Sequence, residues 1–314
     1  MLGIRNTDAM TLDELEAFVT IARAGGFTEA SRRLHRSQPA ISRRIRELET
    51  AVGATLFERV GRRVVPTDAG NALLPHAEAA LAAARDGERA VRDRAGTGTT
   101  LRLAVVGTLA DSHIVDALRE FRSRVERASV DLRTATSREV SALVRGGDAD
   151  LGLRYFADTD PALESVPLGA EKLYVVVPAG HPVTARRLRD LRRLREETWL
   201  GFPPERRRPD SFGHLLERQL VEAGVANPAI TVVDSLTAQK RLVEAGLGIA
   251  LMPVSSVREE VRLGSLRLID ITGMDVAQPV VAVRRANGYR SGLATEFLAV
   301  LAEHTPELVD SGGQ

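Results

Sequence analysis

Polar side chains with strong hydrogen-bonding capacity recur along one face of residues 37–49. Gln38, Ser42 and Arg43 lie at helical spacing, and Arg46 follows almost one turn after Arg43. Arginine pairs bidentately with guanine, glutamine pairs with adenine, and serine accepts several bases. A helix with this face suits a DNA major groove, but an ordinary amphipathic surface helix has the same pattern. The segment alone leaves both interpretations open.

Two short helices separated by a tight break are expected to position these side chains. Thr28 is the predicted N-cap of the first helix and Ser37 that of the second. Residues 34–36 form the break, and Pro39 stands in the first turn of the second helix, where the missing N–H is not needed. The apolar residues of the second helix recur at its period and are expected to face a core: Ala40, Ile41, Ile45 and Leu48.

The flanking residues favour a winged helix-turn-helix. Upstream, an apolar periodic run over residues 12–22 predicts a helix that ends at Gly25 and Gly26, a natural C-terminal stop. Downstream, a basic tip with Arg62 and Arg63 precedes a short apolar strand. A basic hairpin beside a recognition helix places further cations next to the DNA backbone. Arg62 and Arg63 are therefore the expected phosphate or minor-groove contacts of the wing.

Residues 12–70 resemble the DNA-binding domain of LysR-type transcriptional regulators. Three pieces stand in the family's order and spacing: SQPAISRRIRELE, GATLFER and PTDAG. The resemblance implies a protein that binds double-stranded DNA as a homodimer or homotetramer, responds to a small-molecule effector and has RNA polymerase as a further partner. The expected DNA-binding residues are Thr28, Ser37, Gln38, Pro39, Ser42, Arg43, Arg46, Arg62 and Arg63.

Length and composition agree with a globular protein of two or three compact units. The chain has 314 residues and a net charge of +1, but residues 28–63 carry nine Arg against four Glu. Phosphate binding depends on that local balance rather than on the total charge. The chain has no cysteine, which excludes disulfides and thiolate metal sites. No apolar run reaches about 18 residues, and no secretory signal is recognised, so a cytoplasmic protein without a membrane partner is expected.

A long helix is predicted between Thr67 or Asp68, either of which can cap it, and Arg94. Apolar residues at about a 3.5-residue period give it a narrow seam of the coiled-coil type. The seam residues are Leu74, Ala77, Leu81, Ala84 and Val91, interrupted by Pro75 and Gly87. The alternative is a helix that packs only on its own chain. In the LysR-type family this segment pairs two subunits, so the resemblance favours a dimer.

Strands and helices alternate after a short hinge at residues 95–100, which predicts a parallel α/β sheet. A helical Arg-rich piece is expected at 186–196. From residue 101 to about 304 the chain resembles the family's effector-binding region, which folds like a periplasmic binding protein with two α/β lobes. The pieces that carry this resemblance are GDADLGL, EKLYVVVPAGHP and EAGLGIALMP. Two crossing strands are placed near residues 163–168 and 266–271.

The predicted fold is therefore α/β: an N-terminal all-α winged helix-turn-helix, a long linker helix, and two α/β lobes of periplasmic-binding-protein type. The predicted boundaries are 1–68 for the DNA-binding domain, 69–98 for the linker and dimerisation helix with its hinge, and 99–306 for the effector-binding domain. Within the last, lobe I takes about 99–167 plus 267–306, and lobe II takes about 168–266.

Polar residues follow several of the predicted strands, where ligands of open α/β sheets bind. Hydroxyl groups beside helix N-termini favour a carboxylate or another small anion. The family binds its effector between the lobes, which adds weight to these positions. The alternative is that each Ser or Thr only caps a helix. The predicted effector-binding residues are Thr108, Thr136, Ser137, Arg154, Phe202, Ser235 and Thr237.

Other kinds of site are not supported by the sequence. The six histidines have no metal-ligand spacing, and no cofactor is expected. Gly246 and Gly248 follow a helix and precede a strand, the reverse of a dinucleotide motif, and there is no P-loop or Gly-x-Ser-x-Gly elbow. Residues 206–208, three arginines, fit a solvated loop better than a DNA or ligand contact. The rival interpretations are a solute-binding protein and an α/β enzyme without a recognisable catalytic motif; no enzyme activity is expected.

Overall fold

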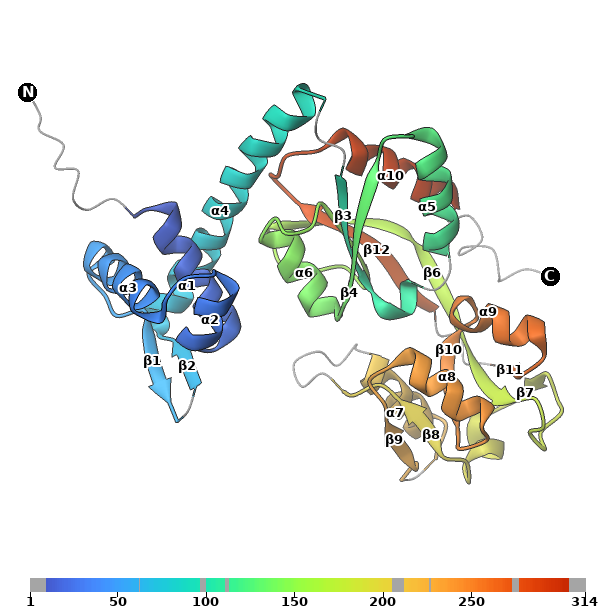
Figure 1. The fold of residues 1–314 in the computed structure, drawn as a ribbon. Coiled ribbons are helices and arrows are strands. Elements are labelled where there is room, and N and C mark those ends of the chain that lie inside the picture. The colour runs from blue at the N-terminus through green and yellow to red at the C-terminus, as the bar shows by residue number, and fades with distance from the viewer. Residues whose placement is uncertain are drawn as a thin grey trace, which may run out of the picture.

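A computed structural model describes residues 10–61, 63–96, 100–110, 113–204, 212–225, 227–272 and 277–304. The winged domain stands at one end of a long helix, and this helix runs along the first of two α/β lobes (Figure 1). The second lobe lies beyond the first. Arg62, the triple arginine at 206–208 and parts of the predicted hinge and termini lie outside the described residues.

The winged domain contains three helices and a two-stranded hairpin around one apolar core. The first helix begins with a capping box between Thr11 and Glu14, and it ends as predicted at Gly25, which has φ +70°. Phe57 joins the hairpin to the helices, because its ring lies 5.2 Å from that of Phe18 and 6.1 Å from that of Phe27. The elements are α1 (Leu12–Ala24), α2 (Phe27–Arg33), α3 (Gln38–Val52), β1 (Phe57–Val60) and β2 (Arg63–Pro66).

The long helix α4 (Asp68–Arg94) begins at Thr67, whose hydroxyl accepts a hydrogen bond from Gly70 N at 3.1 Å. Two of the predicted seam residues, Ala77 and Leu81, are buried in the core of the winged domain of the same chain. Val91, at the other end of the seam, is 69% exposed. The seam is therefore largely an intrachain contact. A different face of α4 is open to solvent and carries Ala72, Ala79, Ala80 and Ala83.

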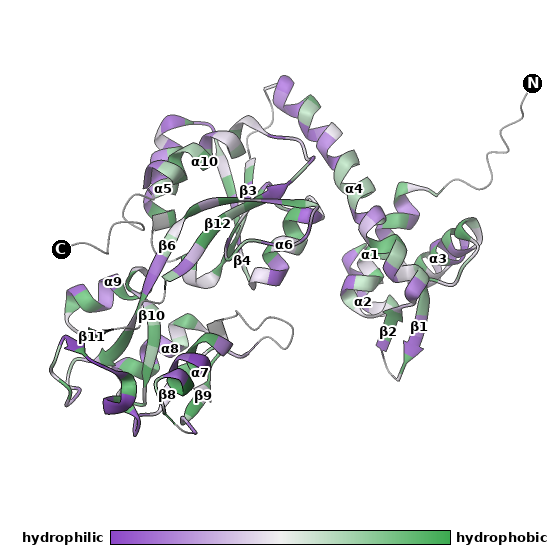
Figure 2. Ribbon diagram, turned by 180° about the vertical axis from the view of Figure 1, so that it is seen from behind, coloured by the Kyte–Doolittle hydropathy of each residue, from purple (hydrophilic) through white to green (hydrophobic). Residues whose placement is uncertain are grey.

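Each lobe has a sheet with an apolar core on each of its two faces. Many residues of these strands are green in Figure 2, the colour of hydrophobic residues. The order of the main sheet is β4-β3-β5-β12-β6-β10-β8-β9. The parallel arrangement predicted from the alternation holds for β4-β3-β5 in lobe I and for β10-β8-β9 in lobe II. The sheet as a whole is mixed, because β6 and β12 run antiparallel to each other and to their neighbours.

The elements of lobe I are β3 (Thr100–Val106), the 3-10 turn η1 (Gly107–Leu109), α5 (His113–Arg124), β4 (Ser129–Ala135), α6 (Ser137–Arg145), β5 (Leu151–Tyr155), β12 (Ala277–Arg285) and α10 (Gly292–His304). The strand β6 (Leu163–Pro178) is shared by both lobes. Those of lobe II are β7 (Arg187–Leu188), η2 (Leu191–Leu194), β8 (Trp199–Gly201), α7 (Phe212–Glu222), β9 (Ile230–Val232), α8 (Leu236–Glu244), β10 (Ile249–Pro253), α9 (Val254–Leu263) and β11 (Leu266–Ile271).

The two lobes are joined by strands that differ in part from the prediction. Strand β6 crosses as expected: it pairs with β12 as far as Lys172 and with β10 from Leu173 onward. The prediction that residues 266–271 cross back is wrong. These residues form β11, which pairs with the lobe II end of β6 and with β7. The next described element in lobe I is β12, which begins at Ala277 opposite Lys172.

Two further segments differ from the sequence prediction. The Arg-rich segment 186–196 contains the short strand β7 and the 3-10 turn η2 instead of an α-helix. Leu191 and Leu194 are both buried three residues apart, the repeat of a 3-10 helix. The helix α9 was not predicted. It begins directly after Pro253 and ends at Gly264 with φ +76°.

Candidate functional site

The exposed face of α3 carries most of the predicted base-reading side chains. Gln38, Pro39, Arg43 and Arg46 are exposed and Ser42 is half-buried. Ile41, Ile45 and Leu48 are buried in the core of the winged domain, as the periodicity predicts. Ala40, which was expected to face the core, is exposed, because it lies about 100° around the helix from Ile41. It adds a methyl group to the outer face.

The two predicted N-caps are only partly correct. Helix α2 begins at Phe27 after Gly26, so Thr28 is its second residue and not its cap. Its hydroxyl lies 3.5 Å from Oε1 of Gln38, across the break. Ser37 does occupy the N-cap position of α3, but its side chain makes no capping bond. The hydroxyls of Thr28 and Ser37 therefore lie beside the start of α3 and do not cap a helix.

The two exposed arginines of α3, Arg43 and Arg46, are oriented by their own helix. Nε of Arg43, whose side chain is 76% exposed, donates to Oε1 of Glu47 at 2.7 Å. This hydrogen bond raises the pKa of Arg43. Nε of Arg46 donates to the carbonyl of Ser42 at 3.4 Å. Because the bond to Glu47 uses the Nε edge of Arg43, the terminal amino groups are left to contact a base edge or a phosphate.

The wing is a two-stranded antiparallel hairpin in which Val60 pairs with Arg63. Arg63 is exposed at the start of β2. The sequence interpretation missed Arg36 and Arg59, which are exposed in the break and on β1. Both lie inside the basic stretch counted from the sequence, and Arg59 stands in the GATLFER piece, so counting charges along the hairpin would have found it.

Four of the predicted effector residues lie at helix N-termini. Thr136 caps α6 by accepting from Glu139 N at 3.4 Å, and Ser235 caps α8 by accepting from Ala238 N at 3.3 Å. The capping alternative is therefore confirmed for both hydroxyls. Ser137 is the half-buried first residue of α6, and Thr237 is an exposed residue in the first turn of α8.

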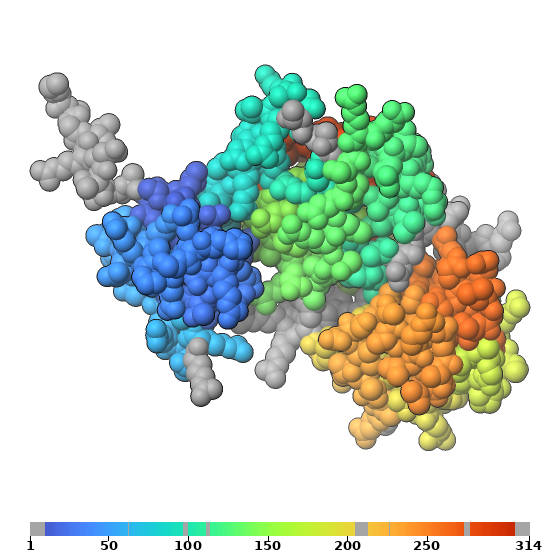
Figure 3. All heavy atoms as spheres, in the orientation of Figure 1, coloured from blue at the N-terminus to red at the C-terminus, as the bar shows by residue number. Residues whose placement is uncertain are grey.

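Two further predicted effector residues, Phe202 and Thr108, follow strands. Phe202 comes directly after β8 and is half-buried. Thr108 is buried in η1, and its carbonyl accepts from Oγ of Ser256 at 3.2 Å. That bond connects lobe I with the start of α9 in lobe II. The space-filling view shows the surface hollowed between the green residues of lobe I and the orange residues of lobe II (Figure 3).

Arg154 has a structural position that the sequence did not predict. Its side chain is 1% exposed and forms an ion pair with Asp158, whose side chain is 7% exposed. Nη1 of Arg154 also donates to Oγ of Ser141 at 2.6 Å, and its Nε donates to the carbonyl of Tyr155 at 3.2 Å. The prediction that Arg154 contacts an effector is thus not supported by its position, because its charge is enclosed and compensated inside lobe I.

A buried polar cluster that sequence reasoning missed joins the lobes. Glu171 on β6 accepts from the phenol of Tyr155 at 2.7 Å and from Oγ of Ser255 at 2.6 Å. Burial, and then the Glu171 charge, raise the pKa of Tyr155 well above its usual value. The hydroxyl of Thr108 lies beside that phenol without completing a hydrogen bond of standard geometry within the described residues. No local sequence pattern connects Tyr155, Glu171 and Ser255.

Among the described residues, no group of His, Cys, Asp or Glu is arranged to hold a metal ion. Within the same ranges, none of the helices is both long and apolar enough to span a bilayer.

Comparisons with known proteins match both halves of the chain. Residues 12–71 match the family described as bacterial regulatory helix-turn-helix protein, lysR family, and residues 94–306 match the LysR substrate binding domain. The transcriptional regulator CfxR of Cupriavidus necator is 29% identical over 307 residues, covering 96% of this chain and 94% of CfxR. CbbR of Rhodospirillum rubrum is 28% identical and covers 92% and 95%.

Solved structures agree with this match. CbnR, a LysR family transcriptional regulator, has a TM-score of 0.63 and 27% identity, covering 94% of this chain and 99% of that one. Full-length CbnR complexed with its target DNA has a TM-score of 0.61 and 28% identity, covering 94% and 100%. The Corynebacterium glutamicum OxyR C206 mutant has a TM-score of 0.56 and 28% identity, covering 97% and 96%.

Proposed function

This chain belongs to the LysR family of transcriptional regulators, and from this we propose that it reads its operator with the first turns of α3 and with the wing. The winged domain, called the head below, is a DNA-binding domain, and an effector-binding domain follows it. The relatives CfxR and CbbR are transcriptional regulators. We propose no catalytic role for it. One observation carries the DNA-reading proposal: the hydrogen-bonding side chains of α3 lie outside while Ile41, Ile45 and Leu48 fill the core.

Base contacts are assigned to the exposed turn of α3. Gln38, Ser42 and Arg43 are the proposed readers of base edges. Pro39, together with the methyl group of Ala40, suits contact with a thymine methyl. The remaining proposed contacts go to phosphates or the minor groove and come from Thr28, Ser37, Arg46, Arg62 and Arg63.

An oligomer is proposed from the open face of α4. Ala72, Ala79 and Ala83 are exposed along this face, and Val91 at the end of the neighbouring seam is also exposed. Small residues allow a second helix to approach closely, so two copies of α4 can pair and place two heads about one helical turn of DNA apart. We propose a homodimer or homotetramer that acts on chromosomal DNA in the cytoplasm, with RNA polymerase as a further partner.

The effector is proposed to be a small anion bound between the lobes. Helices α6 and α8 present free N–H groups at their N-termini, beside Thr136, Ser137 and Thr237. These groups favour a carboxylate. Ser235 would act through the cap that it forms, and Phe202 and Thr108 would line the wall. The proposed site does not include Arg154, because its charge is paired inside lobe I.

DNA binding is tested with the fragment upstream of the protein's own coding sequence. Purified protein is titrated at low and moderate salt in the presence of random competitor DNA. Retention that survives both supports a sequence-specific regulator. Binding that disappears with salt and competitor leaves only charge attraction and contradicts the proposed operator.

Replacing Arg43 by Ala is expected to weaken binding to the specific site by about 1–3 kcal/mol, because a bidentate guanine contact is lost. Random DNA should lose much less. The matched control is Arg44→Ala on the same helix, since Arg44 pairs with Asp13 inside the winged domain. Competition titrations with specific and random duplexes give both affinities. An equal loss on the two duplexes would reduce Arg43 to a phosphate contact.

Replacing Thr237 by Val is expected to lower effector affinity about tenfold, because a buried ligand oxygen loses its hydrogen-bond donor while the side-chain shape is kept. A panel of small carboxylic acids is scanned by thermal shift to find a ligand, and its affinity is then measured by calorimetry. Ser235→Ala is the informative comparison, because it removes the α8 cap and lowers stability by about 1 kcal/mol without ligand. Unchanged affinity in Thr237→Val would place the ligand elsewhere.

A further inference from the structure

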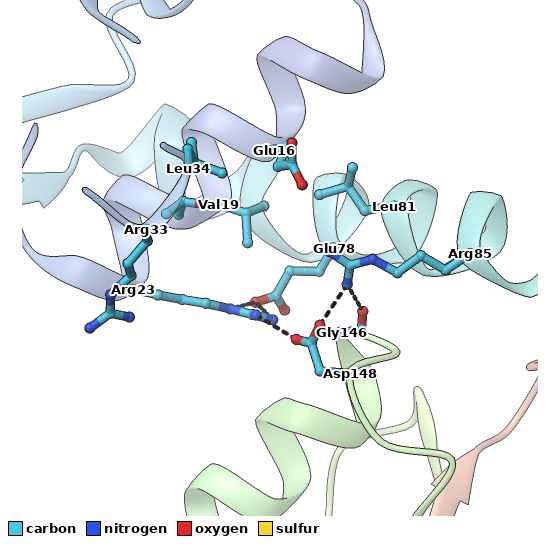
Figure 4. Close-up of a pocket in the computed structure, with 11 residues that line it drawn as sticks. Glu16, Val19, Arg23, Arg33, Leu34, Glu78, Leu81, Arg85, Gly146 and Asp148 are labelled. Carbon is cyan, nitrogen blue, oxygen red and sulfur yellow. Dashed lines mark hydrogen bonds and ion pairs between the residues drawn. The ribbon is translucent and has the colours of Figure 1, made fainter. Parts of the chain in front are cut away.

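The winged domain, α4 and lobe I meet around a cavity of about 240 Å³ (Figure 4). One wall is apolar and carries Val19, Leu34 and Leu81. The opposite wall consists of charged side chains that point toward one another across the three parts of the chain. We name four residues the junction cluster: Arg23 at the end of α1, Glu78 on α4, Arg145 at the end of α6, and Asp148 in the following loop.

Glu78 is the buried centre of the junction cluster. Its side chain is 5% exposed, and each carboxylate oxygen bonds to a different part of the molecule. Oε1 accepts from Nε and Nη2 of Arg23 at 3.3 and 3.1 Å, and Oε2 accepts from Nε of Arg145 at 2.8 Å. A buried carboxylate requires such partners, because an unpaired charge in this position is strongly destabilising. Glu78 therefore ties the head to lobe I through its two arginines.

Arg23 also contacts lobe I directly. Its Nη1 donates to Oδ2 of Asp148 at 3.0 Å, while Oδ1 of Asp148 accepts from Arg85 of α4 at 2.9 Å. The approach is close: a Cβ on Gly146 would lie 2.4 Å from Nη2 of Arg23. Glycine at position 146 thus leaves room for the guanidinium between the head and the lobe.

Helix α4 is bound to lobe I farther along its length. Nη1 of Arg89 bonds to Asp150 at 2.8 Å, and Asp86 accepts from Tyr289 N at 2.9 Å. The phenol of Tyr289 also bonds to Asp93 at 3.0 Å. These contacts hold α4 and lobe I as one unit. The apolar core that includes Ala77 and Leu81 packs the head on α4. Arg23 adds a direct charged link from the head to lobe I.

We propose that Glu78 and Asp148 are positioning residues for DNA binding, which act through Arg23 to hold the head against lobe I and so set the placement of α3. This inference rests on the proposed reading of DNA by α3. The bonds from Arg23 to Glu78 and to Asp148 differ in the exposure of the carboxylate. Glu78 is buried, whereas Asp148 and Arg23 have side-chain exposures of 27% and 32%, so salt or a movement of lobe I weakens the Asp148 bond first.

The first test measures the position of the head without DNA. The chain has no cysteine, so Thr50→Cys on α3 and Glu126→Cys on lobe I, both exposed positions, introduce two unique labelling sites. Spin-labelled chains are diluted with excess unlabelled protein, so that each oligomer carries one labelled chain. We expect one narrow distance distribution in the otherwise unchanged chain and a broadened or shifted one in Asp148→Asn and Arg23→Gln. Identical distributions would overturn the proposal.

A double-mutant comparison shows whether the two residues act through one bond. If they do, Arg23→Gln combined with Asp148→Asn should broaden the distribution no more than Arg23→Gln alone. Additive broadening would contradict the direct link. The matched control is Arg119→Gln, which removes an exposed ion pair with Asp116 within α5, away from the junction. Its distribution should equal that of the unchanged chain.

The second test uses DNA and separates this proposal from the proposed function. On the upstream fragment, Asp148→Asn should shift the boundary of the protected region by up to about 10 base pairs, one helical turn, because the bond between Arg23 of the head and lobe I is lost. Its affinity for a duplex with a single half-site should stay within about twofold. An unchanged footprint would overturn the positioning role. Failure of the unchanged chain to retain the fragment would instead refute the operator, and the distance measurement would still test the junction.

Discussion

An Asp158→Ala variant is expected to lose about 3–5 kcal/mol of folding free energy, because it removes the carboxylate that pairs with the buried Arg154 guanidinium inside lobe I. Arg154 and Asp158 have side-chain exposures of 1% and 7%. The expected fall in the unfolding midpoint of the full chain is about 10 °C. Scanning calorimetry measures it, and hydrogen exchange of peptides that cover β5 and α6 locates the loss in lobe I.

A double variant distinguishes the buried charge from a general packing defect. Arg154→Met combined with Asp158→Ala removes both charges and keeps much of the arginine volume, so it should be clearly more stable than Asp158→Ala alone. A loss below about 1 kcal/mol in Asp158→Ala would mean that Arg154 reaches water. In that case the earlier assignment of Arg154 to the effector site would stand again.

A Gly70→Ala variant is expected to destabilise the winged domain by about 3 kcal/mol. A Cβ at this position would lie 2.2 Å from the carbonyl oxygen of Leu56 and 3.0 Å from Cβ of Pro66. The Leu56 carbonyl cannot move away freely, since it accepts the hydrogen bond from Thr67 N at 3.0 Å at the start of α4. The start of α4 would have to shift against the hairpin. Calorimetry and retention of the upstream DNA both report the damage.

The same helix offers a control of opposite sign. Gly87 lies in the interior of α4, and a Cβ built there meets no atom within 4 Å. Gly87→Ala should therefore stabilise the protein by about 0.5–1 kcal/mol, because alanine loses less backbone entropy in a helix. If Gly70→Ala also stabilised the protein, helix propensity would outweigh the contact with Leu56.

The local elements of this chain could be predicted from the sequence because their determinants are local. Gly25 ends α1 in the left-handed conformation, and Ser37 marks the start of α3. The start of α6 at Ser137 is also determined locally, because Thr136 and Glu139 form a capping box. The apolar period of α3 also determined which of its faces is buried. The resemblance of residues 12–70 rested on these same short-range features.

Tertiary structure decided what covers each face and which charges meet. The period of α4 predicts a seam, but only the folded chain shows that Ala77 and Leu81 cover the head instead of a partner. The composition of β11 is that of any short strand and does not indicate which lobe contains it. Its pairing with the lobe II end of β6 places β11 in lobe II. Local composition sets the form of an element, whereas its neighbours depend on contacts between distant parts of the chain.

The buried charged residues show most clearly what could not be predicted from the sequence. The sequence predicts that Arg154 follows a strand and contacts a ligand, yet Arg154 lies inside β5, where Ser141 and Asp158 enclose it. Glu78 looks like any acidic residue of a surface helix, but it meets Arg23 from 55 residues and Arg145 from 67 residues away. The sequence determined that these side chains carry charge. Only the fold determined their burial and their partners, because both depend on surfaces that separate segments bring together.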